Sequence, residues 1–228
     1  MSAQSIKATV YLFPGQGSDS MIFSNWTWDT TQYKIVHIHY HTPNKGQTMA
    51  EYAQELMPQI ENEGKYFFVG VSLGGMLSVE LADTLNPSKT IIISSAQNRS
   101  ELPSRYRFMR NFRLYNAISA KRYKKSSIRT QKIVEPDRAN DAELFSAMLN
   151  RKDSLFLKRA THMIVQWSRK QTPENVVNIH GDNDHTIPIK NVTAAYTIEG
   201  GSHMMAHTRS EEVFSIVQKE LLGLTVND

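Results

Sequence analysis

Two kinds of hydrophobic pattern alternate along the chain. Short apolar runs are typical of buried strands, and apolar positions three and four residues apart are typical of helices. The runs that predict strands lie at 8–13, 34–40, 65–71, 90–94, 175–180 and 194–198. The helical spacing outside the middle of the chain lies at 48–60, 73–85 and 211–222. Strands that alternate with helices predict an α/β fold with a mostly parallel, doubly wound sheet of about six strands.

The segment 96–172 interrupts this alternation between two predicted strands. It contains no strand-like run, and its apolar residues follow at least three helical patterns, at 108–115, 144–149 and 156–167. A helical insertion between two strands of a sheet is not a linker, and we expect it to fold over the strand ends as a cap. The length and composition suit one domain over residues 1–228, with the cap inside it.

The net positive charge of the chain is confined to the same segment. Residues 96–172 contain 18 Lys and Arg against 6 Asp and Glu, a net charge of +12, which leaves the rest of the chain at −8. The simplest interpretation is a solvated charged face. Two functional interpretations stay open: attraction of an anionic substrate, such as an acyl group on coenzyme A or a carrier protein, or contact with an acidic membrane surface. Nucleic acid is not expected, because the aromatic residues follow helix-core spacing and match no RNA-binding motif.

The composition excludes several kinds of chemistry. The chain has no Cys, which excludes disulfides, a thiolate nucleophile and Cys–metal sites. Its N-terminal residues show no charged start followed by a long apolar stretch, and no run reaches membrane-spanning length. We therefore expect no signal peptide and a cytoplasmic location.

The most informative motif is Gly-Val-Ser-Leu-Gly-Gly at 70–75, between a predicted strand and a predicted helix. A Ser flanked two residues away on each side by Gly, in this context, is typical of a nucleophile elbow. The tight turn leaves no room for side chains at Gly70 and Gly74, and it holds Ser72 in a strained conformation. The alternative is a plain Gly-rich turn with no chemical role.

A base and an orienting acid are needed to activate such a Ser, and candidates for both follow later strands. Asp182 and Asp184 come directly after the strand at 175–180, and His203 and His207 follow the strand at 194–198. In open α/β sheets, catalytic groups lie at the carboxyl ends of the strands. Spacing alone leaves both acids and both histidines open.

Four stretches of the chain are similar to the α/β-hydrolase superfamily: PGQGS at 14–18, GVSLGG at 70–75, HGDNDHTIP at 180–188 and GGSH at 200–203. With the order of the strands, the resemblance covers essentially the whole chain outside the cap. It implies a serine esterase or thioesterase, with the helical cap inserted after the strand at 90–94, the equivalent of the family's sixth strand. The family pattern at the acid matches Asp184, and the pattern at the base matches His203.

The resemblance also implies roles. Ser72 would be the nucleophile, His203 its base and Asp184 the acid that orients His203. The oxyanion hole would use the backbone N–H groups of Leu73 and Gln16. Many relatives have His-Gly where this chain has Pro14-Gly15, which keeps the backbone donor and loses the hydrogen bonds of that His.

The substrate pocket and any metal site are less well defined by the sequence. Trp26 could line the acyl pocket, but surface or core packing is an equally open interpretation. The run His37–His41 places three His on one face of a strand, where they could bind Zn²⁺, although packed or hydrogen-bonded histidines are favoured. We expect no metal and no cofactor. The residues expected to line the pocket are Trp26, His41, Ile187 and Met204.

The leading hypothesis is therefore a serine hydrolase that cleaves a small-molecule ester or thioester through an acyl-enzyme. One alternative is an acyltransferase with the same three residues, and 13–18 does resemble the start of malonyl-carrier transacylases. Those enzymes are longer and lack the arrangements at 180–188 and 200–203. The other alternative is a non-catalytic protein of this fold that binds a ligand.

Overall fold

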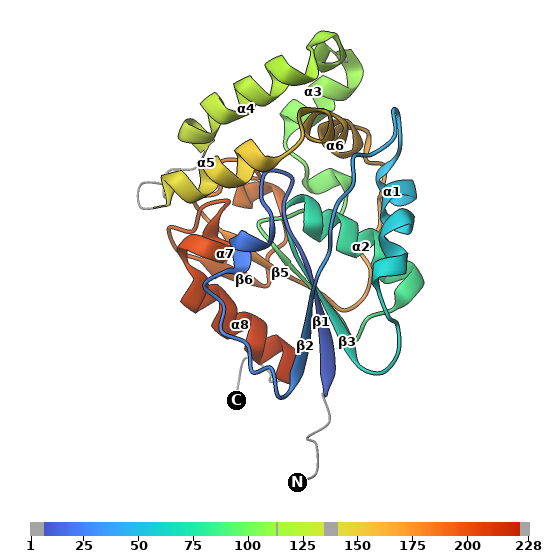
Figure 1. The fold of residues 1–228 in the computed structure, drawn as a ribbon, viewed down its shortest axis with the longest axis vertical. Helices are drawn as coiled ribbons and strands as arrows, with labels where there is room; N and C mark the ends of the chain where they lie inside the picture. Colours follow the sequence, from blue (N-terminus) through green and yellow to red (C-terminus); the bar gives the residue numbers. More distant parts are fainter. Residues whose placement is uncertain (1–6, 113, 135–140, 224–228) are drawn as a thin grey trace.

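The computed structural model describes residues 7–112, 114–134 and 141–223, so Arg113 of the basic segment lies outside the described residues. Six strands form one sheet in the order β2-β1-β3-β4-β5-β6, and every neighbouring pair is parallel (Figure 1). This confirms the predicted sheet. The strands are β1 (Ala8–Phe13), β2 (Tyr33–His37), β3 (Tyr66–Val71), β4 (Lys89–Ile93), β5 (Val176–Gly181) and β6 (Tyr196–Ile198).

Helices cover both faces of the sheet, and each face has its own apolar core. Figure 1 shows α1 and α2 on one side of the strands and α8 on the other. Tyr11 and Phe68 belong to the core beneath α1 and α2, whereas Val10 and Val69 belong to the core beneath α8. This alternation follows from the two-residue period of a strand. The helices outside the cap are α1 (Met49–Leu56), α2 (Leu73–Leu85), α7 (Met205–Thr208) and α8 (Ser210–Leu222).

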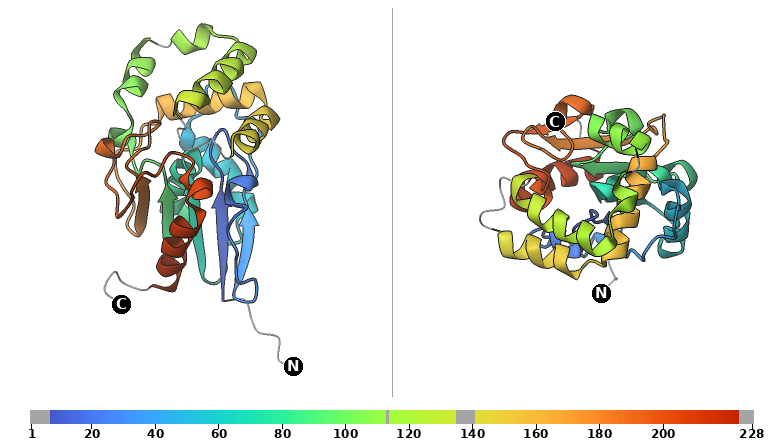
Figure 2. Two further views of the ribbon diagram at one scale, coloured as in Figure 1. Left: turned by 90° about the vertical axis from the view of Figure 1, so that its left-hand side faces the viewer. Right: turned by 90° about the horizontal axis from the view of Figure 1, so that it is seen from above.

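The segment between β4 and β5 forms the cap. In the left view of Figure 2 its helices group together beyond the strand ends, at the opposite end from the start of β1. The cap contains one helix that apolar spacing did not mark, Ala120–Val134, because few of its residues are apolar. Tyr123 and Ile128 of this helix pack partly buried against the core. The cap helices are α3 (Ser104–Phe112), α4 (Ala120–Val134), α5 (Ala142–Arg151) and α6 (Ser154–Gln166).

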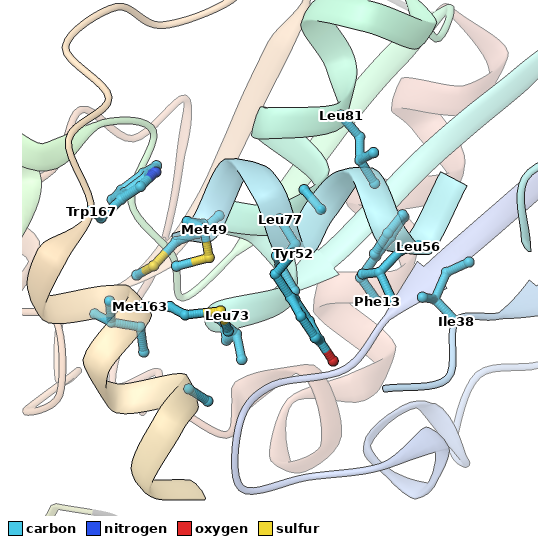
Figure 3. Packing of buried hydrophobic residues seen from close by; sticks show 14 of the residues in the cluster. Phe13, Ile38, Met49, Tyr52, Leu56, Leu73, Leu77, Leu81, Met163 and Trp167 are labelled. Atoms are coloured by element: carbon cyan, nitrogen blue, oxygen red, sulfur yellow. The ribbon is translucent and has the colours of Figure 1, made fainter. Parts of the chain in front are cut away.

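The cap shares its buried surface with the sheet. Phe145 and Met148 of α5 are fully buried in the core beneath α8, and Met163 of α6 is buried in the other core. Figure 3 shows Met163 and Trp167 beside Met49 and Leu73. The side-chain N–H of Trp167 also donates a hydrogen bond to Glu80 of α2, at 2.5 Å. The cap is therefore fixed to the strand ends by apolar contacts with both cores.

Two element ends differ from the sequence prediction for identifiable reasons. Strand β2 stops at His37 because Gln59 hydrogen-bonds both the backbone N–H and the backbone C=O of His39, which takes His39 out of the ladder. Helix α1 begins with a capping box between Thr48 and Glu51 and gives way to a 3₁₀ turn that contains Pro58. The 3₁₀ turns are η1 (Ser20–Phe23), η2 (Met57–Gln59), η3 (Arg99–Glu101), η4 (Leu114–Ala117) and η6 (Ile189–Asn191).

None of the helices within the described ranges is long and apolar enough to cross a lipid bilayer.

Truncation of a cap residue should destabilise the whole fold if the cap shares the core of the sheet. Phe145→Ala removes a fully buried ring and should lower the free energy of unfolding by about 3–5 kcal/mol. Phe108→Ala, the same change at a ring that is 57% exposed on α3, should cost less than about 1 kcal/mol. Urea unfolding measures both. Equal effects of the two changes would contradict the shared core.

Candidate active site

Ser72 lies in a tight turn between β3 and α2. Its backbone has φ 53° and ψ −118°, a region that non-Gly residues rarely adopt. A Cβ at Gly70 would lie 2.5 Å from the carbonyl oxygen of Gly74, and a Cβ at Gly74 would lie 2.1 Å from that of Phe13. Any side chain at either position would overlap the backbone. The turn therefore has the strained, Gly-dependent geometry that the sequence predicts.

Hydrogen bonds from the neighbouring strand hold Ser72 in this conformation. Its backbone N–H donates to the carbonyl of Ile93 at the end of β4, at 3.0 Å. Its carbonyl accepts a hydrogen bond from the hydroxyl of Ser95, at 2.6 Å. The backbone strain at Ser72 is thus opposed by contacts on both sides of the residue, which leaves the Ser72 side chain available for other partners.

A chain of hydrogen bonds joins Ser72, His203 and Asp184. The Ser72 hydroxyl lies 2.9 Å from Nε2 of His203, and Nδ1 of His203 lies 2.8 Å from Oδ2 of Asp184. An ionised carboxylate only accepts hydrogen bonds, so Nδ1 of His203 carries a proton and donates a hydrogen bond to Asp184. Nε2 is then the acceptor that faces the Ser72 hydroxyl. This tautomer is the one that can remove a proton from Ser72.

Asp184 is buried, and hydrogen bonds support its charge. One carboxylate oxygen accepts hydrogen bonds from the backbone N–H groups of Thr186 and Ile187, at 2.7 and 2.8 Å. The other oxygen faces His203 and lies 3.4 Å from Nε2 of His180. Burial alone would raise the pKa of the Asp184 carboxyl, but His203 and His180 hold that pKa well below its usual range. Asp184 therefore stays ionised while it is out of contact with water.

Close contact between two loops brings Asp184 to His203. A Cβ at Gly181 would lie 2.0 Å from the carbonyl oxygen of Gly201, so the two loops touch through their backbones. The N–H of Asn183 also donates to the Gly201 carbonyl, at 3.0 Å. One loop follows β5 and carries Asp184, and the other follows β6 and carries His203. The contact between the loops therefore sets the distance between these two side chains.

The two competing residues lie elsewhere. Asp182 is exposed, and its carboxylate accepts a hydrogen bond from the backbone N–H of Gly200, at 2.7 Å, which supports the turn. His207 is buried against the ring of Phe145 and lies 3.4 Å from the carboxylate of Asp141. His203 is therefore the hydrogen-bond partner of the Ser72 hydroxyl, and Asp184 is the partner of His203.

The loop after β1 lies against Ser72. A Cβ at Gly15 would be 3.5 Å from the Cβ of Ser72. The side chain of Gln16 donates hydrogen bonds to the Leu157 carbonyl and the Thr161 hydroxyl of α6, at 2.5 and 2.7 Å, which fixes this loop to the cap. Leu73 is the first residue of α2, where helix geometry leaves the backbone N–H without an acceptor inside the helix.

A cavity of about 220 Å³ opens between Ser72 and the cap, and we refer to it as the Ser72 cavity. Its walls are mostly apolar. The cap contributes residues that the sequence prediction did not include, because periodicity does not show which face of a cap helix turns toward the sheet. The lining includes Gln16, Ser18, Ser72, Met76, Tyr106, Ser127, Thr130, Leu149, Ile164, Thr186, Ile187, His203 and Met204.

Of the four residues expected to line the substrate pocket, Ile187 and Met204 line the Ser72 cavity, whereas Trp26 and His41 do not. Trp26 packs between the rings of Phe23 and Phe214 in the core beneath α8, and its side-chain N–H donates to the Ala206 carbonyl, at 2.8 Å. His41 lies beyond the end of β2, where the chain turns toward α1.

The three histidines of 37–41 do not converge on one point. Nε2 of His41 lies 2.7 Å from the carboxylate of Glu55 on α1, whereas the His37 ring packs beside Phe23. Within the described ranges, no three His, Asp or Glu side chains are grouped as metal ligands. His180, which was not among the expected site residues, contacts Asp184, with 3.4 Å between its Nε2 and the carboxylate. Its position at the start of the 180–188 motif is the sequence feature that could have pointed to this contact.

Comparison with known proteins shows the fold. No family model matches the chain, and no curated protein matches it in sequence. A hydrolase structure from Pseudomonas aeruginosa PA01 superposes with a TM-score of 0.69 at 16% identity, covering 95% of this chain and 90% of the other.

Two further structures are similar over nearly the whole chain. A thermophilic esterase from Thermogutta terrifontis has a TM-score of 0.68 at 13% identity, over 96% and 91% of the two chains. The enol-lactonase from Burkholderia xenovorans LB400 has a TM-score of 0.67 at 14% identity, over 96% and 92%. The chain therefore has the α/β-hydrolase fold.

The close approach at the turn predicts a strong effect of a single methyl group. Gly74→Ala places a Cβ against the Phe13 carbonyl and should lower the free energy of unfolding by more than about 2 kcal/mol. Gly17→Ala is the matched control, because its Cβ would be in ordinary contact with Leu149, at 3.5 Å; it should change stability by less than about 1 kcal/mol. Urea unfolding of both variants measures the difference, and a neutral Gly74→Ala would refute the close approach.

Proposed function

We propose that this protein is a serine hydrolase that cleaves a carboxylic ester or thioester through an acyl-enzyme on Ser72. The observation that carries the proposal is the hydrogen-bonded chain from Ser72 through His203 to the buried Asp184, with Ser72 on a strained turn. A strained turn is costly for stability, and a buried carboxyl with a strongly lowered pKa is typical of functional sites, so their coincidence beside a cavity favours a catalytic role.

The first half of the reaction forms the acyl-enzyme. Nε2 of His203 takes the proton of the Ser72 hydroxyl while Oγ attacks the substrate carbonyl carbon, which gives a tetrahedral oxyanion. The oxyanion collapses, the bond to the leaving alcohol or thiol breaks, and His203 returns its proton to that group. Asp184 keeps the His203 ring in the required tautomer and stabilises the transient imidazolium.

The second half repeats these steps with water. His203 takes a proton from a water molecule, whose oxygen attacks the acyl carbonyl. Collapse of this second oxyanion releases the carboxylic acid, and His203 returns the proton to Ser72. The backbone N–H groups of Leu73 and Gln16 are the proposed donors to both oxyanions, and one such donor accounts for about 10²–10³ in rate.

The Ser72 cavity limits the acyl group. Its volume of about 220 Å³ and its apolar lining by Met76, Leu149 and Ile164 favour a short, uncharged acyl chain. Similar structures described as esterases, and one described as an enol-lactonase, agree with ester chemistry, while another described as a non-heme bromoperoxidase has the same fold.

Covalent labelling tests the nucleophile. A fluorophosphonate probe should label the wild-type protein and Ser127→Ala, which changes another serine of the same cavity, but it should not label Ser72→Ala. Short-chain p-nitrophenyl esters or acyl thioesters should turn over, and Ser72→Ala should lower kcat by about 10⁴-fold or more.

Persistent labelling of Ser72→Ala would overturn the assignment. Absence of turnover with every ester and thioester would favour the non-catalytic alternative, in which the cavity only binds a ligand.

A further inference from the structure

A second cavity, of about 460 Å³, lies at the start of α3, and we refer to it as the α3 cavity. Its walls come from the segment that leads into α3 and from the segment that follows the Asp184 loop. Three of its residues are cationic and none is acidic. The lining consists of Ser100, Leu102, Pro103, Ser104, Arg105, Arg107, Pro188, Lys190 and Asn191.

The α3 cavity is a neighbour of the Ser72 cavity. The same two stretches of chain line both: Tyr106 and Ile187 belong to the Ser72 cavity, and the adjoining Arg105 and Pro188 belong to the α3 cavity. Arg105 donates a hydrogen bond to the carbonyl of Thr186, across the boundary between them. The Arg105–Thr186 contact therefore separates two neighbouring cavities, and a molecule that occupies both has to pass it.

The cations of the α3 cavity lack acidic partners. Arg107 and Lys190 are exposed, and no carboxylate in the described part of the chain pairs with either of them. The nearby Glu101 is buried, and its carboxylate already accepts hydrogen bonds from the N–H groups of Gln97 and Thr193, at 2.7 and 3.1 Å. Glu101 does not line the α3 cavity.

More positive charge surrounds the same region. Arg99 precedes Ser100 of the lining, and its guanidinium donates to the Trp167 carbonyl, at 2.5 Å. Burial, and then the guanidinium groups of Arg110 and Arg107, lower the pKa of Arg99. Like charges gathered in one region repel one another, and a bound anion relieves that repulsion.

We propose that the α3 cavity binds an anionic group, a carboxylate or a phosphate, on the alcohol or thiol portion of the substrate. This inference rests on the proposed function, because it assigns the acyl portion to the Ser72 cavity. Guanidinium and ammonium groups are the usual partners of both anions. The division between an apolar cavity at Ser72 and a cationic one beside it gives the two ends of the substrate different environments.

Selectivity between matched substrates tests the proposal. The substrates are butyryl thioesters of mercaptoalkanoic acids of two chain lengths, together with their neutral amides. A thiol reagent measures the released thiol without background, because the protein has no Cys. Of the two acid thioesters, the one that the wild type cleaves faster should have a kcat/KM about tenfold or more above that of its amide. A charge-assisted hydrogen bond contributes enough binding free energy for a ratio of this size.

Two double variants identify the source of the selectivity. Arg107→Gln/Lys190→Gln should bring the ratio of acid to amide close to one. Arg122→Gln/Lys125→Gln removes the same charge from exposed positions of α4 that do not line the cavity, and it should keep the ratio. An equal loss in the two variants, or a wild-type ratio near one, would overturn the α3 cavity as the anion site.

Direct binding separates this proposal from the proposed function. Phenyl phosphate and benzoate, titrated into Ser72→Ala and followed by calorimetry, distinguish phosphate from carboxylate recognition. Binding of either probe that disappears with Arg107→Gln/Lys190→Gln supports the site even if no thioester turns over. Failure of both probes to bind, in a protein that does hydrolyse neutral thioesters, would overturn the anion site and leave the proposed function standing.

Discussion

Two backbone contacts that only Gly permits determine the geometry of the site. A Cβ at Gly74 would meet the Phe13 carbonyl at 2.1 Å, and a Cβ at Gly181 would meet the Gly201 carbonyl at 2.0 Å. The first contact holds the turn of Ser72 against the end of β1. The second holds the loop after β5 against the loop after β6. Because both loops follow parallel strands, these contacts bring residues distant in sequence to one edge of the sheet.

The polar and apolar parts of the site depend on each other. Asp184 stays ionised in a buried position because backbone N–H groups and His203 support its charge. The cap covers Ser72 with an apolar cavity. Asp184 is buried behind His203, and its removal from water strengthens its attraction for His203. Beside that cavity lie the cations Arg107 and Lys190, with which no carboxylate among the described residues pairs. Ser72 thus lies beside an apolar cavity and near a cationic one.

The sequence predicted best what short motifs determine. The strained turn at Ser72 follows from a motif of a few residues, and Asp184 and His203 were identified because each lies in its own short motif after the end of a strand. It predicted poorly what depends on packing between distant segments. Trp26 was expected in the pocket but packs in the core beneath α8. The cap residues that line the Ser72 cavity, such as Tyr106, had no local signal in the sequence.

The most direct test of the Ser72–His203–Asp184 chain compares two neighbouring acids. Asp184→Asn keeps the shape of the side chain but disfavours the tautomer that accepts the Ser72 proton, and should lower kcat for ester hydrolysis by about 10⁴-fold. Asp182→Asn changes an exposed turn residue and should lower kcat by less than about tenfold. Circular dichroism checks that both variants fold. A larger loss for Asp182→Asn, or little loss for Asp184→Asn, would contradict the assignment.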